Sequence, residues 1–173
     1  MRDFKSDLAL IFEPVRSNYI ETISTINQPI QAVMSPEHPL SKFKSINLAD
    51  CQKYPLALPP SPYAVREILE TAAAEESLDL NPTVEAESYI LLHNFVLRKK
   101  NAISFEVEID VPKQSLDRSI STVPINLSKS HQGQIHLLKL QGRTFSGATE
   151  QFIKQLLYVC LLYTSPSPRD VVP

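Results

Sequence analysis

Two short segments carry the polar side chains best suited to binding a small molecule. Residues 59–63 follow a short apolar run that we predict to be a strand, and they precede a predicted helix. Residues 87–89 have the same position between a second strand and a second helix. The N–H groups and the dipole at the start of a helix favour an anion such as a carboxylate, and the hydroxyls of Ser61 and Ser88 would add hydrogen bonds. Helix capping is the alternative role for each serine.

Three more side chains are candidates for the same site. Tyr63 would lie against the ligand, or else be a half-buried aromatic on the surface. Arg66 would pair with a carboxylate of the ligand, or else be a solvated charge beside Glu67 and Glu70. Phe105 would form a wall of the site, or else pack in the core. The predicted ligand contacts are therefore Ser61, Tyr63, Arg66, Ser88 and Phe105.

No group of residues predicts catalysis or metal binding. The four histidines lack the spacing of metal ligands. Phosphate-binding loops, dinucleotide fingerprints and nucleophile elbows are missing from the sequence. Three acidic residues alternate with apolar ones, which is typical of the solvent face of a strand: Glu106, Glu108 and Asp110. We therefore predict no enzyme activity, no metal and no cofactor.

The composition narrows the classes of protein to which this chain could belong. The chain has 173 residues, a formal net charge of −2 and 43% hydrophobic residues, which suits one domain or two small lobes. A nucleic-acid-binding surface usually leaves a basic footprint, which this chain lacks. No segment reaches the length of about 20 apolar residues that spans a bilayer, and residues 1–7 do not resemble a signal peptide. We expect a cytoplasmic protein in which Cys51 is a small buried hydrophobe.

The hydrophobic pattern alternates between strands and helices. Continuous or alternating apolar runs predict strands at residues 8–12, 30–34, 56–58, 83–86, 102–105 and 135–140. The run at 8–12 is apolar throughout, as in a strand covered on both faces. Pro124 makes residues 121–125 an edge strand. Helical spacing predicts helices at residues 62–76 with Ser61 as N-cap, from Ser88 onward, and from Ser146 onward. This order indicates an α/β fold with a parallel sheet.

The order of several short segments resembles one protein family. The segments are Asp7-Leu8-Ala9, His38-Pro39-Leu40, Leu48-Ala49-Asp50, Tyr54-Pro55-Leu56, then Arg66 and Ser146. Over about residues 6–158 this order resembles the effector-binding domain of LysR-type transcriptional regulators. The resemblance implies a periplasmic-binding-protein-like, two-lobed Rossmann-type α/β domain that is truncated at its N-terminus. A small effector would bind in the cleft between the lobes.

The resemblance also implies a division of the chain. Residues 1–29 and 129–159 would be the remnant of lobe I, and residues 30–128 would be lobe II. Residues 160–173 resemble a translated sequencing adapter, so we expect this tail to be an artefact. The winged helix-turn-helix domain of the family would precede Met1 in the parent protein.

The function that the resemblance implies is effector sensing. The parent protein would bind DNA only through its missing N-terminal domain, would form a homo-oligomer, and would have no membrane segment. The alternative is the solute-binding protein of a transporter, which shares the two-lobed clamp. The segments His38-Pro39-Leu40 and Leu48-Ala49-Asp50 favour the regulator.

Overall fold

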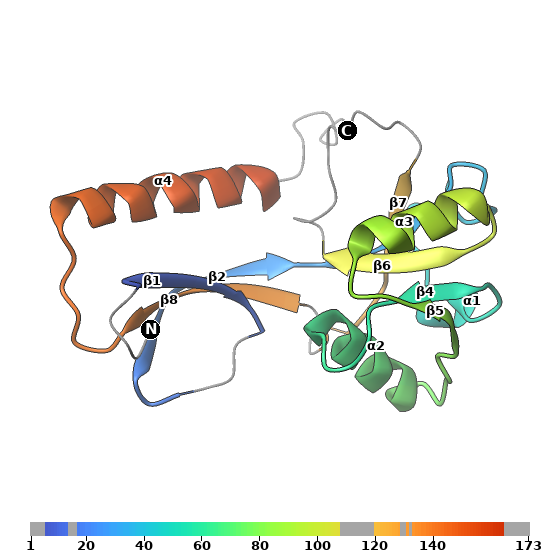
Figure 1. The fold of residues 1–173 in the computed structure, drawn as a ribbon, viewed down its shortest axis with the longest axis horizontal. Coiled ribbons are helices and arrows are strands. Elements are labelled where there is room, and N and C mark those ends of the chain that lie inside the picture. The colour runs from blue at the N-terminus through green and yellow to red at the C-terminus, as the bar shows by residue number, and fades with distance from the viewer. Residues whose placement is uncertain (1–5, 14–16, 108–119, 129–130, 132, 165–173) are drawn as a thin grey trace, which may run out of the picture. The chain divides into compact units, whose positions relative to one another are not determined.

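The computed structural model describes residues 6–13, 17–107, 120–128, 131 and 133–164. The chain forms two compact units (Figure 1). Unit 1 combines Met1–Gln28 with Gln134–Pro173, and unit 2 comprises Pro29–Gly133. The predicted α/β class is confirmed, with one sheet in each unit.

Unit 2 is built on a five-stranded sheet in the order β5-β4-β6-β3-β7. Its strands are β3 (Ile30–Met34), β4 (Leu56–Leu58), β5 (Pro82–Glu85), β6 (Ile103–Val107) and β7 (Ser121–Pro124). Strand β4 runs parallel to β5 and β6, whereas β3 runs antiparallel to β6 and β7. The sheet is therefore mixed rather than wholly parallel. Strand β7 lies at an edge, as its proline predicts.

Helices cover both faces of this sheet, with α2 (Ala64–Glu75) and α3 (Tyr89–Arg98) on opposite sides (Figure 1). Helix α3 buries Leu92 and Val96 against Ala57 and Ala102. Helix α2 buries a stripe formed by Val65, Leu69, Ala72 and Ala73. Because both faces are covered, all five residues of β3 and of β6 are buried. A short helix, α1 (Leu48–Cys51), precedes β4.

The start of α2 differs from its prediction. Its N-cap is Tyr63, not Ser61, and the helix begins at Ala64 rather than Pro62. The reason is a turn across residues 60–63, which is closed by a 3.0 Å hydrogen bond from the Tyr63 N–H to the Pro60 carbonyl. The predicted starts of the other two long helices are confirmed, with Ser88 at the N-cap of α3 and Ser146 before α4 (Gly147–Thr164). The Ser146 Oγ accepts a 3.3 Å hydrogen bond from the Thr149 N–H.

Unit 1 contains a three-stranded sheet in the order β1-β8-β2. Its strands are β1 (Leu8–Phe12), β2 (Ile20–Gln28) and β8 (Gly133–Leu140), and α4 contacts β2. The prediction that β1 is covered on both faces is wrong, because Leu10 and Ile11 are 45% and 39% exposed. Strand β1 lies at the edge of this sheet and pairs with β8. None of the helices in the described part of the chain is long and apolar enough to cross a membrane.

Candidate functional site

Two strands and two helices of unit 2 meet at one edge of its sheet. Strands β4 and β5 are parallel, so both end at the same edge, and a 3.2 Å hydrogen bond from the Ala86 N–H to the Leu58 carbonyl joins their ends. The chain turns there into α2 after β4 and into α3 after β5. We call this the carboxyl edge. In open α/β sheets, ligands bind at such an edge, where helix N-termini present unpaired N–H groups.

Three of the predicted contact residues lie exposed in the two loops of the carboxyl edge. Ser61 and Tyr63 belong to the turn between β4 and α2, and Ser88 is the N-cap of α3. Neither helix receives a capping hydrogen bond from the side chain of its N-cap residue. The capping role that we considered as the alternative is therefore not seen for either serine. The Ser88 backbone carbonyl still accepts the N–H groups of Leu91 and Leu92, so α3 has a regular first turn.

Arg66 lies in the first turn of α2 and is buried, with 7% of its surface exposed. Its Nε donates to Glu70 Oε1 at 2.5 Å, and its Nη1 donates to Glu85 Oε1 at 2.8 Å. Nη1 also donates to the Pro59 carbonyl at 3.3 Å. The alternative that Arg66 is a solvated charge is therefore wrong. Its guanidinium joins α2 to the ends of β4 and β5, and so holds together the elements that form the carboxyl edge.

Phe105 lies in the middle of β6 and is fully buried, opposite Ala32 of β3. It packs within the core of unit 2. Its role as a wall of a ligand site is untested and stays a prediction.

The largest departure from the sequence prediction is Glu106. We expected the solvent face of a strand, but Glu106 is 1% exposed; Glu108 and Asp110 lie outside the described residues. Strand β6 is the central strand of the sheet, and α3 covers the face to which Glu106 points. His93 of α3 brings its Nε2 within ion-pair distance of Glu106 Oε1. A period of two identifies a face of the strand but does not tell whether a helix covers that face, so this pair could not be predicted from the sequence pattern.

His38 is buried in the turn that follows β3. Its Nδ1 accepts the Leu40 N–H at 3.1 Å, and its ring meets the edge of the Tyr54 ring at 4.5 Å between centroids. Desolvation lowers the pKa of His38 below 6.5, although an interaction with the Asn101 backbone opposes this. The Nε2 atom makes no hydrogen bond of acceptable geometry, so desolvation is the dominant effect on this ring. His38 thus stabilises the turn as a neutral imidazole.

Cys51 is fully buried in α1, which confirms the prediction of a small hydrophobe. Burial raises the pKa of its thiol to about 12, with a smaller contribution from the nearby Asp50. A thiol with so high a pKa is a poor nucleophile. Across the described residues, no three histidine, cysteine, aspartate or glutamate side chains are grouped so that they could hold a metal ion.

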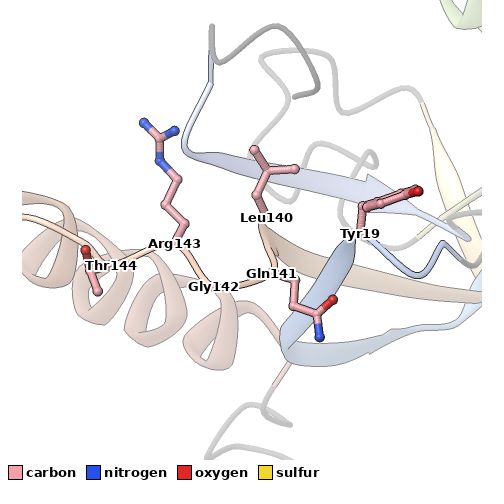
Figure 2. A pocket seen from close by; sticks show the side chains of 6 residues that line it. All are labelled: Tyr19, Leu140, Gln141, Gly142, Arg143 and Thr144. Carbon is pink, nitrogen blue, oxygen red and sulfur yellow. The ribbon is translucent and has the colours of Figure 1, made fainter.

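A separate pocket of about 770 Å³ lies in unit 1 (Figure 2). It surrounds the turn after β8 and is lined by Tyr19, Leu140, Gln141, Gly142, Arg143 and Thr144. The pocket is wide open to solvent, and the Arg143 guanidinium is paired with Asp7. It contains none of the predicted contact residues, so we regard the carboxyl edge as the stronger candidate site.

Comparison with known proteins gives a family and a fold. The family model of the LysR substrate binding domain matches residues 1–160. No match was found among the curated proteins. One similar structure is the effector binding domain of QuiR in complex with shikimate, with a TM-score of 0.70 and 24% identity, covering 92% of this chain and 74% of that one. Another is the regulatory domain of CcmR from Synechocystis PCC6803 in complex with 2-PG, with a TM-score of 0.75 and 15% identity, covering 92% and 76%.

A third similar structure is HinK, a LysR family transcriptional regulator from Pseudomonas aeruginosa. Its TM-score is 0.75 at 16% identity, and the alignment covers 92% of this chain and 54% of HinK. The chain thus spans about half of that regulator. All three identities lie below 25%, so these structures show the fold.

Proposed function

The chain belongs to the family of LysR substrate binding domains, and from this premise we propose that it senses a small-molecule effector for a LysR-type transcriptional regulator. The match over residues 1–160 is the observation that carries this proposal. Two similar domains, those of QuiR and CcmR, have structures in complex with shikimate and with 2-PG. The family match and these regulators favour this function over that of a transporter's solute-binding protein. Domains of this family belong to regulators rather than to enzymes, so we propose no catalytic role.

We propose that the effector binds at the carboxyl edge of the sheet in unit 2. The N-termini of α2 and α3 both point to this edge, and each supplies backbone N–H groups and a positive dipole end. Ser61, Tyr63 and Ser88 are exposed beside them. This arrangement supports an effector with an anionic group, such as a carboxylate. Arg66 and Phe105 stay predicted contacts, although both side chains are buried.

We further propose that a separate domain of the parent protein binds DNA, and that the parent is a cytoplasmic homo-oligomer. The similarity to HinK, of which this chain spans 54%, supports the existence of further domains.

The test is a ligand panel measured by calorimetry and thermal shift. The panel contains small carboxylates and phosphates, including shikimate and 2-PG. For a ligand that binds, we expect the double variant Ser61→Ala/Ser88→Ala to lose about tenfold or more in affinity, since each lost hydrogen bond is worth about 0.5–1.5 kcal/mol. The control is Ser121→Ala, which removes a hydroxyl from the opposite end of the sheet. Equal losses in both variants would contradict the proposed site.

A further inference from the structure

The face of the sheet beneath α3 contains two buried polar side chains and a half-buried histidine whose hydrogen bonding is incomplete. Glu106 and Ser104 are two residues apart on β6, so both point to the same face, and His93 reaches Glu106 from α3. Glu106 is 1% exposed and Ser104 is fully buried. We call Glu106, Ser104 and His93 the Glu106 cluster.

The hydrogen bonding of this cluster is incomplete. Glu106 Oε1 and His93 Nε2 lie within ion-pair distance, yet neither atom makes a hydrogen bond of acceptable geometry. The Ser104 Oγ has no partner either. Buried polar groups in proteins are nearly always hydrogen-bonded, and a buried carboxylate without enough donors is costly. The cluster therefore contains acceptor atoms that lack a hydrogen-bond donor.

The neighbours of the cluster within the sheet supply no charged donor. Gln31 lies opposite Glu106, while Ala57 and Val33 lie opposite Ser104. None of these three side chains carries a charge, and His93 of α3 is the titratable group in ion-pair contact with Glu106. The two residues offer too few ligands for a metal ion.

We propose that the Glu106 cluster binds a primary ammonium group, so that the effector of this domain carries an amine. An ammonium group has three donors and no acceptor, which matches the carboxylate of Glu106 and the hydroxyl of Ser104. A second anion would be repelled by the same carboxylate. This inference rests on the proposed function and specifies the class of effector.

The position of the cluster fits an effector with both an amine and a carboxylate. Ala57 of the three-residue β4 pairs with Ser104, so Glu106 lies at the level where β4 ends, at the carboxyl edge. His93 follows the first residue of α3, Tyr89, by four residues, or about 6 Å along the helix axis. An anionic group at the start of α3 and an ammonium at Glu106 would thus belong to an effector whose amine and carboxylate lie further apart than they do in an α-amino acid.

His93 and the ammonium group compete for one carboxylate. A protonated imidazole beside Glu106 would repel an ammonium group, whereas a neutral imidazole would not. Binding of an amine at Glu106 therefore changes the surroundings of the His93 ring. This coupling provides a readout that does not require the natural effector.

The test uses the whole chain with ¹³C-labelled histidine and three probes: methylammonium, tetramethylammonium and methanol. Methylammonium carries both charge and donors, tetramethylammonium has charge alone, and methanol has a neutral donor. We expect methylammonium to shift the His93 resonances in a saturable manner, and the other two probes to leave them unchanged. The variant His93→Gln assigns these resonances among the four histidines.

Two variants test whether the response to methylammonium depends on Glu106. Glu106→Gln keeps the shape of the side chain and removes its charge, so we expect the affinity for methylammonium to fall about tenfold or more. The matched control is Glu76→Gln, which removes an exposed carboxylate from the C-terminal end of α2 and should change the affinity less than about twofold. If Glu106→Gln does not fold, the comparison of the three probes on the unaltered chain decides.

Three results would overturn the inference: no response to methylammonium, an equal response to tetramethylammonium, or a response that persists in Glu106→Gln. In each case the cluster holds only water or is satisfied by His93 alone. The proposed function would stand, because it is tested independently through the binding of anionic ligands at Ser61 and Ser88.

Discussion

Replacement of Arg66 by methionine should destabilise unit 2 by about 3 kcal/mol. Methionine keeps the apolar stem within the core and removes the guanidinium. The bond from Nη1 to the buried Pro59 carbonyl is worth about 1.5 kcal/mol, because its donor is charged. The side chains of Glu70 and Glu85 are 45% and 48% exposed, so solvent screens each pair to about 0.5–1 kcal/mol. Together these contributions give the predicted loss.

The assay is urea unfolding followed by circular dichroism, with the free energy of unfolding taken from the midpoint and the slope. Two further variants separate the contribution of the planar guanidinium to stability from that of the pair with Glu85. Arg66→Lys keeps the charge but loses the planar fork, so it should recover about half of the loss. Glu85→Gln should cost less than about 1 kcal/mol, since that carboxylate is half exposed.

A loss below about 1 kcal/mol in Arg66→Met would refute the reasoning, because that is the value of a solvated surface pair.

The same variants test the predicted contact between Arg66 and the effector. If Arg66 holds the carboxyl edge together without contacting the ligand, Arg66→Lys should lower the stability and leave the ligand affinity within about twofold. A large loss of affinity in a folded Arg66→Lys variant would instead support direct contact.

Three further predictions concern the core of unit 2. Leu92→Ala removes a fully buried side chain and should cost about 2–5 kcal/mol in urea unfolding, whereas Leu91→Ala, at a position that is 59% exposed, should cost less than about 0.5 kcal/mol. The pKa of His38 is lower in the folded chain than its unfolded value of 6.5, so protonation favours unfolding and stability should fall as the pH drops through about 6.5. His38→Gln should reduce this pH dependence, and an unchanged dependence would assign it to other groups. In a Cys160→Ser background, Cys51 should react with a thiol reagent only after urea is added, because its thiol is buried and its pKa is about 12; rapid labelling of the folded chain would contradict this.

The elements that were predicted correctly are those with local signals. The apolar run of β3, the proline that makes β7 an edge strand and the serines before α3 and α4 each lie within the segment that they define. The start of α2 was misplaced because two signals competed. Residues 60–63 could either cap a helix at Ser61 or close a turn, and the hydrogen bond from Tyr63 to Pro60 shows that the turn was formed.

The site residues depend on contacts between distant segments, which a pattern along the chain does not contain. The partner of Arg66 in i+4 spacing, Glu70, is visible in the sequence, but Glu85 is 19 residues away on another strand. Glu106 looked like a solvent-facing residue because its neighbours alternate. Its burial follows from the central position of β6 and from the placement of α3, both of which are properties of the assembled sheet.

The two faces of the sheet satisfy their buried charges in different ways, and this difference bears on function. On the face covered by α2, the guanidinium of Arg66 has two carboxylates and a carbonyl as partners, so the charges compensate one another. On the face covered by α3, Glu106 has one imidazole in poor geometry, and Ser104 has no partner. A satisfied network holds its elements in one arrangement, whereas an unsatisfied one gains free energy from a ligand that completes it. The α2 face would thus keep the carboxyl edge rigid, and the α3 face would supply the polar group that distinguishes one effector from another.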